Sequence, residues 1–122
     1  MAEKKRILVV DDSSFLRNSL KKILEKYGYA VVGMAENGVQ TITKYKELKP
    51  DLVTLDIIMP QMNGLNTLKL LRSVDPNACV VMVSSMSSKE SVTDCIQAGA
   101  KNYILKPFEE GKVIEVIRKN LA

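Results

Sequence analysis

Side chains that can take part in phosphoryl transfer stand at the ends of four short apolar runs in this 122-residue chain. They are two adjacent aspartates, a third aspartate, a serine and a lysine, namely Asp11 and Asp12, Asp56, Ser84, and Lys106. A carboxylate can attack phosphorus to give an aspartyl-phosphate. The charge that spreads over the transferring oxygens then needs an ammonium, a hydroxyl donor and a metal ion around it. The pattern therefore indicates phosphoryl chemistry, provided that the fold brings these side chains together.

Three of these side chains are carboxylates, which repel one another unless a proton or a cation neutralises them. Mg²⁺ fits such a cluster, because it takes oxygen ligands and commonly uses one or two carboxylates together with substrate phosphate. The chain has no histidine, so it lacks the imidazole ligands that zinc favours. Taken singly, Asp11 and Asp12 could merely cap a helix, Ser84 could be a turn residue and Lys106 a solvated side chain. The combination favours the chemical interpretation.

The elements that must position these residues alternate between strands and helices along the chain. Short apolar runs predict strands at residues 7–10, 30–35, 52–55, 79–83 and 102–105. Apolar residues at helical spacing predict a helix after each strand, at about 14–27, 39–48, 65–72, 90–98 and 109–121. Ser13 or Ser14 is expected to cap the first helix, Asn37-Gly38 to form a turn, and Gly99 to end the fourth helix.

This order predicts an α/β fold of three layers, a doubly wound, flavodoxin-like (βα)5 arrangement around a parallel five-stranded sheet. The expected strand order is 2-1-3-4-5, which makes the strands that end at Asp11-Asp12 and at Asp56 neighbours. Ligands of such sheets bind beyond the carboxyl ends of the strands, where the strand order reverses. The length fits one domain, residues 1–122, and we expect no output domain.

Composition narrows the class of protein further. The net charge is +4 and the pI is about 9.1, but the 18 basic residues are spread along the chain, and their densest run is Lys4-Lys5-Arg6. Nucleic acid is therefore not an expected partner. Cys79 and Cys95 have neither metal-ligand nor disulfide-framework spacing, so we expect both to be reduced. No apolar stretch approaches the roughly 20 residues of a membrane span, and no signal peptide is evident; a cytoplasmic protein without membrane contact is expected.

The combination of these motifs resembles the signature of two-component response-regulator receiver domains. It comprises the acidic pair, the third aspartate with a Met-Pro and a glycine after it, the serine, and a Lys-Pro-Phe run: Asp11-Asp12, Asp56, Met59-Pro60, Gly64, Ser84, and Lys106-Pro107-Phe108. The resemblance covers the whole chain and is greatest to the stand-alone chemotaxis members of the family. It implies a monomeric switch that assists its own phosphorylation and dephosphorylation but is not an enzyme.

The resemblance also implies a role for each residue. Asp56 would accept a phosphoryl group from a histidine kinase or a small phosphodonor. Asp12, Asp56 and the backbone carbonyl of Ile58 would hold Mg²⁺, with Asp11 completing the metal site through water. Lys106 would bind the phosphoryl oxygens. Ser84 would move toward the phosphoryl group.

Tyr103 matches the switch aromatic of the family, which turns inward as that hydroxyl moves. The plainer interpretation is a half-buried core aromatic. A new dianion at Asp56 would favour one of two loop arrangements, and the face made by the fourth helix, fifth strand and fifth helix would change. In the family this face binds a downstream target, here expected to be a flagellar motor switch, and a phosphatase is a further possible partner.

The chain differs from many members of the family at residues near the acceptor. Ser84 stands where many members have threonine, and the serine keeps the hydroxyl group. Ile58 and Met86 lie two residues beyond Asp56 and Ser84 and are both apolar. Apolar neighbours offer an attacking water no hydrogen-bond partner, so we hypothesise slow self-dephosphorylation.

Four alternatives remain open from the sequence. An aspartyl-phosphate hydrolase similar to the haloacid-dehalogenase phosphatases would normally carry Asp-x-Asp-x-Thr after the first strand, where this chain has Asp11-Asp12-Ser13. A flavodoxin-like binding module would need a phosphate-cradling loop there, and no glycine-rich turn is present. A receiver-like interaction protein that is never phosphorylated would leave the acidic and cationic set without a purpose. A phosphorelay intermediate that passes its phosphoryl group to a histidine would use the same pocket.

Overall fold

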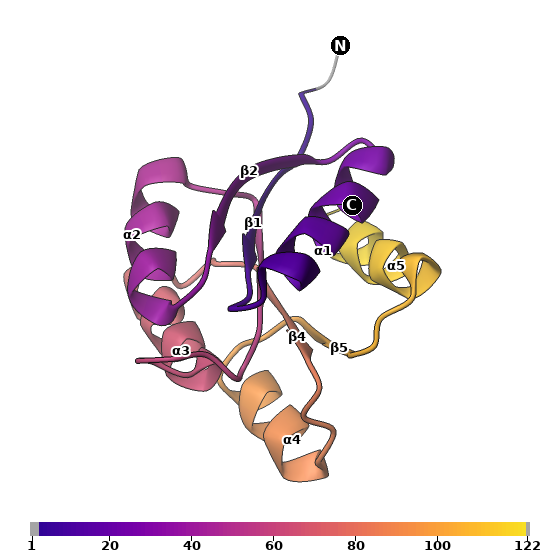
Figure 1. The fold of residues 1–122 in the computed structure, drawn as a ribbon. Coiled ribbons are helices and arrows are strands. Elements are labelled where there is room, and N and C mark those ends of the chain that lie inside the picture. Colours follow the sequence, from indigo (N-terminus) through magenta and orange to yellow (C-terminus); the bar gives the residue numbers. More distant parts are fainter. Residues whose placement is uncertain (1–2, 122) are drawn as a thin grey trace.

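The computed structural model describes residues 3–121, in which five strands alternate with five helices (Figure 1). The strands are β1 (Arg6–Val10), β2 (Ala30–Ala35), β3 (Leu52–Leu55), β4 (Val80–Ser84) and β5 (Asn102–Leu105). The helices are α1 (Ser14–Lys26), α2 (Gly38–Leu48), α3 (Gly64–Val74), α4 (Lys89–Gln97) and α5 (Glu110–Asn120). All pairs of neighbouring strands are parallel, in the order β2-β1-β3-β4-β5. The predicted fold class and strand order are confirmed.

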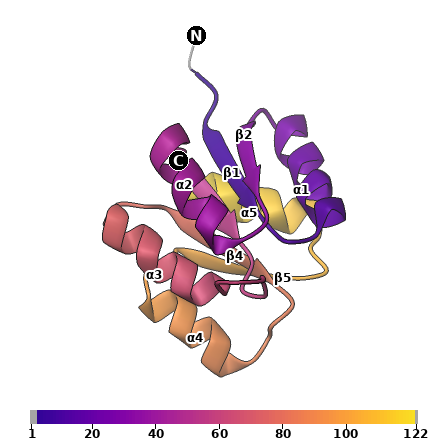
Figure 2. The same ribbon diagram turned by 60° about the vertical axis from the view of Figure 1, so that its left-hand side comes forward.

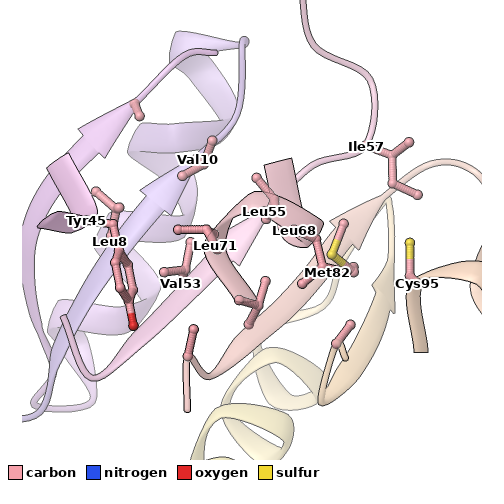
Figure 3. Close-up of a cluster of buried hydrophobic side chains, with 14 of the residues drawn as sticks. Leu8, Val10, Tyr45, Val53, Leu55, Ile57, Leu68, Leu71, Met82 and Cys95 are labelled. Atoms are coloured by element: carbon pink, nitrogen blue, oxygen red, sulfur yellow. The ribbon is translucent and has the colours of Figure 1, made fainter. Parts of the chain in front are cut away.

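The sheet separates two apolar cores, because successive strand residues point to opposite faces. Leu8 and Val10 of β1 belong to the core under α2, α3 and α4, which Figure 3 shows in close-up with Leu68 and Leu71 of α3. Ile7 and Val9 face the other core, under α1 and α5. Figure 2 shows α2, α3 and α4 side by side. Both faces of the sheet are covered, which explains why the strands are almost wholly apolar.

The helices begin at polar caps that the sequence contains. Ser13 accepts a hydrogen bond from the amide of Leu16, and Asn37, Asn63 and Ser88 cap α2, α3 and α4 in the same way. Asn37 is therefore a helix cap rather than part of a separate turn. Gly99 has φ +108° and follows α4, as predicted. Glu109 precedes α5 without a side-chain capping bond.

The position of one strand differs from the prediction, and two apolar helix residues are exposed. The fourth strand lies one residue later than predicted, so Ser84 is its last residue and Cys79 precedes it. Phe15 and Val39 lie at helical spacing with core residues, yet they are 75% and 55% exposed. Both residues stand in the first turn of their helices, and this turn does not yet lie over the sheet.

Two further observations concern cysteines and membranes. Cys79 and Cys95 are both free thiols, and burial raises the pKa of each. The helices within residues 3–121 lack the length and apolar character needed to cross a bilayer.

Candidate functional site

The acidic residues meet because β1 and β3 are adjacent and end together. Val10 is paired with Leu55 in the sheet, so the residues that follow these strands leave at the same point of its carboxyl edge. One carboxylate oxygen from each of Asp11, Asp12 and Asp56 lies within 4.8 Å of the others. Asp11 and Asp56 are buried, whereas Asp12 is exposed. Of the three carboxylates, that of Asp12 is therefore the most accessible to solvent.

Lys106 extends from the end of β5 into this cluster. Its Nζ atom donates hydrogen bonds of 2.6 Å to Asp11 Oδ2 and 2.9 Å to Asp56 Oδ2. Burial alone would lower the pKa of Lys106, but the hydrogen bonds and charges of the two aspartates outweigh it and raise the pKa. The backbone amide of Lys106 donates to the Ser84 carbonyl, and the Lys106-Pro107 peptide bond is cis. The side chain therefore stays an ammonium that is held against both carboxylates.

Ser84 and Tyr103 are linked through one backbone segment. The Ser84 hydroxyl is fully buried and accepts a 3.3 Å hydrogen bond from the amide of Met86. The Tyr103 hydroxyl donates a 2.5 Å hydrogen bond to the carbonyl of that same residue. Burial raises the pKa of Tyr103, and the nearby Ser84 hydroxyl acts in the opposite direction. Tyr103 is half-buried, and its hydroxyl is bound to the loop that follows Ser84.

The backbone after Asp56 is held by short-range hydrogen bonds. Asp56 Oδ1 accepts from the amide of Ile58 at 3.3 Å, and the amide of Gly64 donates to the Ile57 carbonyl at 2.7 Å. The second bond closes the loop between β3 and α3 against the strand end. Gly64, which the sequence indicated only as part of a motif, thus packs beside the residue that is expected to react.

The donor set suits a magnesium ion. The three clustered side chains are all carboxylates, which are hard oxygen ligands. They lie beside the ammonium of Lys106, which already offsets part of their charge. The fold therefore brings together the carboxylates that were predicted to bind Mg²⁺. The role of the Ile58 carbonyl as a metal ligand remains a prediction; the Ile58 side chain is 54% exposed.

Arg17 is a residue of this site that the sequence did not identify. Its guanidinium donates a 2.6 Å hydrogen bond to the backbone carbonyl of Asp11. The only available signal was a basic residue one turn into the helix that follows the acidic pair. That spacing is common in solvated helices and does not mark a contact.

A comparison with protein families and relatives places the chain among known proteins. The model of the response regulator receiver domain matches residues 7–118. The chemotaxis protein CheY of Thermotoga maritima is 49% identical over 115 residues, which are 94% of this chain and 96% of that protein. CheY of Bacillus subtilis is 51% identical over 116 residues, covering 95% of this chain and 97% of the relative.

Solved structures agree with this comparison. A chain in the crystal structure of the CheX-CheY-BeF3-Mg+2 complex from Borrelia burgdorferi superposes with a TM-score of 0.96 at 34% identity, covering 98% of this chain and 91% of its own length. The response regulator domain of Thermotoga maritima CheB gives a TM-score of 0.89 at 35% identity, with 97% and 96% covered.

Proposed function

The chain belongs to the response regulator receiver domain family, and we propose that it is a chemotaxis signalling switch controlled by phosphorylation of Asp56. In this proposal a histidine kinase supplies the phosphoryl group, and the phosphorylated protein changes its affinity for a downstream protein, with a flagellar motor switch as the expected target. The observation that carries the proposal is the contact of one ammonium, that of Lys106, whose side chain is only 13% exposed, with both Asp11 and Asp56.

Asp56 is the best placed of the three carboxylates to act as nucleophile. It follows β3, the middle strand of the sheet, and lies between β1 with its acidic pair and β4 with Ser84. One of its oxygens would form the new bond to phosphorus. The phosphorus–nitrogen bond of a phosphohistidine, or the phosphorus–oxygen bond of a small phosphodonor, would break, and the leaving group would depart with the bonding electrons. Asp11 and Asp56 each accept two hydrogen bonds, but those of Asp11, from Lys106 and the amide of Ser13, are shorter, at 2.6 and 2.9 Å against 2.9 and 3.3 Å for Asp56, so Asp11 is held more tightly.

The surrounding groups match the charge that this step creates. The transferred group carries negative charge on its equatorial oxygens. Lys106, already 2.9 Å from Asp56 Oδ2, would shift its hydrogen bonds to those oxygens, and the Ser84 hydroxyl would donate to them. Asp11, Asp12 and Asp56, with the Ile58 carbonyl, would hold Mg²⁺, which when bound neutralises carboxylate and phosphoryl charge. The site would thereby assist phosphorylation and dephosphorylation of its own residue without turning over another substrate.

The route from Asp56 to a partner surface would pass through Ser84 and Tyr103. If the Ser84 hydroxyl turns toward a phosphoryl group, the hydrogen bond it accepts from Met86 is lost or weakened. The Tyr103 hydroxyl is bound to the carbonyl of Met86, so the position of the aromatic ring is tied to the same loop. Tyr103 lines a surface hollow at the end of β5 together with residues that include Leu105, Phe108 and Lys112. We therefore place the switchable partner surface on α4, β5 and α5.

Two exposed apolar side chains, those of Phe15 and Ile58, lie close in the chain to the acidic residues. A histidine ring must reach Asp56, so the protein that carries it must contact the edge of the acidic cluster. Phe15, at the start of α1, is 75% exposed, and Ile58, just after the acceptor, is 54% exposed. Both follow strands that end at the cluster. In this proposal the protein that carries the histidine contacts both side chains.

Transfer from a phosphorylated histidine kinase of the chemotaxis type tests this function. We expect label to move from the kinase to the wild-type chain and not to an Asp56→Asn variant. A Phe15→Ser variant should accept phosphoryl groups more slowly from the kinase but at the normal rate from acetyl phosphate. Rapid onward transfer to a histidine phosphotransfer protein would instead indicate a phosphorelay intermediate. Absence of transfer from kinase and acetyl phosphate alike would contradict the proposal.

A further inference from the structure

Arg17 connects the loop that carries the acidic pair to the neighbouring strand. One terminal nitrogen of its guanidinium donates to the Asp11 carbonyl at 2.6 Å. The other lies 4.0 Å from a carboxylate oxygen of Glu36, which follows β2. The Asp11 amide donates to the Ala35 carbonyl at 3.1 Å. The segment after β1 is thus held from the β2 side by both its backbone and the Arg17 side chain.

The atom that Arg17 holds controls the direction of two carboxylates. The carbonyl of Asp11 and the amide of Asp12 form one planar peptide unit. A hydrogen bond that fixes this carbonyl therefore restricts rotation on both sides of the plane, at the Cα atoms of Asp11 and Asp12. The side chain of Asp11 is held further by Lys106 and by the Ser13 amide. Asp12 is exposed, and within residues 3–121 its carboxylate accepts no hydrogen bond. The orientation of the peptide plane is then the main constraint on the direction of the Asp12 side chain.

The burial of Arg17 and the charge on its guanidinium indicate that this side chain makes a specific contact and is not simply solvated. The side chain of Arg17 is only 16% exposed, whereas Glu36 is 56% exposed. Hydrogen bonds from a charged donor are shorter and stronger than neutral ones, and the 2.6 Å bond to the carbonyl fits this description. The 4.0 Å ion pair with an exposed glutamate contributes little, as surface pairs generally do. The contact with the Asp11 carbonyl is therefore the one that matters.

We propose that Arg17 is a positioning residue for the metal site: by fixing the peptide unit between Asp11 and Asp12, it sets the two carboxylates in the arrangement that binds Mg²⁺. The inference deepens the proposed function by naming a residue that supports the same site, and rests on it for the identity of the metal. Arg17 contacts no reacting atom, so it acts on affinity for the ion rather than on the phosphoryl step itself.

The test is titration calorimetry of the full chain with MgCl₂ alone, for the wild type and for Arg17→Gln, Glu36→Gln and Arg72→Gln variants. Arg72 is a matched control, because its guanidinium also donates to a backbone carbonyl, that of Ala78 at 3.2 Å, but at the amino end of β4. Thermal unfolding of each variant checks that the fold is retained. Phosphorylation by acetyl phosphate is then followed over a range of Mg²⁺ concentrations.

For Arg17→Gln we expect the Mg²⁺ dissociation constant to rise about tenfold, the lower end of the effect seen for groups that orient metal ligands. The Glu36→Gln and Arg72→Gln variants should bind Mg²⁺ nearly as the wild type does. At saturating Mg²⁺ the phosphorylation rate of Arg17→Gln should approach that of the wild type, since only the affinity has changed. Unchanged Mg²⁺ affinity in Arg17→Gln, or an equal loss in Arg72→Gln, would overturn the inference. The calorimetric result does not depend on phosphorylation, so a failure of the proposed function would be seen separately.

Discussion

Gly64 packs against the backbone of Asp56 so closely that a side chain has no room there. A Cβ atom built on Gly64 would lie 2.0 Å from the Asp56 carbonyl oxygen and 2.6 Å from the Cα of Ile57. The obstructing atoms are backbone, which cannot move aside as the end of a flexible side chain can. The start of α3 is therefore a direct support for the residue proposed to accept the phosphoryl group.

A Gly64→Ala variant should be less stable and should be phosphorylated poorly. Overpacking typically lowers the free energy of unfolding by about 1–3 kcal/mol. Displacement of the backbone would also move Asp56 away from Lys106. Urea denaturation and the rate of phosphorylation by acetyl phosphate measure the two effects. Gly111→Ala is the matched control, since a Cβ on Gly111 would meet nothing within 4 Å and alanine favours a helix by roughly 0.5–1 kcal/mol. Wild-type stability in Gly64→Ala would contradict the packing described.

The buried hydroxyl of Thr54 should cost stability. It lies in β3, two residues before Asp56, and is the one buried side-chain oxygen or nitrogen atom in residues 3–121 that lacks a hydrogen-bond partner. A Thr54→Val change keeps the shape and removes the unpaired group, so the free energy of unfolding should rise by about 1 kcal/mol.

Thr67→Val provides the comparison for that change. The Thr67 hydroxyl donates a 2.9 Å hydrogen bond to the Asn63 carbonyl, so its removal should lower the free energy of unfolding. Urea midpoints of both variants decide the matter. If both substitutions destabilise equally, the Thr54 hydroxyl has a partner after all.

The contact between Tyr45 and Asp75 should make stability depend on pH in the acid range. The Tyr45 hydroxyl donates a 2.7 Å hydrogen bond to Asp75, and this bond, with that from the Asn77 amide, lowers the pKa of Asp75. A carboxyl with a lowered pKa in the folded state stabilises the fold above its unfolded pKa of about 4. This contribution disappears as the pH falls through the folded value.

A Tyr45→Phe variant measures the contribution. The loss of unfolding free energy relative to the wild type should be largest near neutral pH and should shrink as the pH falls below about 4. Urea denaturation at a series of pH values gives the two curves. A constant difference between the curves down to the lowest pH would show that Asp75 does not sense Tyr45.

Apolar neighbours of the acceptor should make the phosphoryl group long-lived. Ile58 is exposed and Met86 half-buried, and neither can orient an attacking water. An Ile58→Asn, Met86→Glu double variant should lose its phosphoryl group faster, by a factor on the order of ten, below the roughly hundredfold that a well-positioned proton-transfer group provides. The decay after removal of the phosphodonor measures the lifetime, with Val74→Asn as a control at an exposed apolar site on α3. An unchanged lifetime in the double variant would rule the explanation out.

The sequence predicted those parts of the fold that depend on local patterns. Apolar runs and caps such as Ser13 and Gly99 located the ten elements, and the residues at the strand ends identified the acidic cluster. Contacts that depend on three-dimensional approach were not predictable. The hydrogen bond from Arg17 to the Asp11 carbonyl depends on where separate segments meet, and no period or motif marks it. Gly64 was part of a recognised motif, but its close fit against the backbone of Asp56 was not predictable from that motif.

The exposure of Phe15 has a similar explanation. Helical periodicity assigns a residue to a face of the helix, but it does not say whether the sheet extends under that turn. Phe15 stands in the first turn of α1, beyond the end of β1, and remains exposed. Helical periodicity agrees with burial where the helix lies over the sheet, as for Val113 and Ile117 of α5, which are fully buried.

The central claim is that Asp56 accepts the phosphoryl group, and intact mass spectrometry after incubation with acetyl phosphate and Mg²⁺ tests it most directly. We expect the wild-type chain to gain one labile phosphoryl group, and an Asp56→Asn variant and a sample containing a metal chelator to gain none. An Asp75→Asn variant, changed at a carboxylate on the opposite edge of the sheet, should behave as the wild type. A wild-type chain that stays unmodified, or an Asp56→Asn variant that is modified to the same extent, would contradict the account.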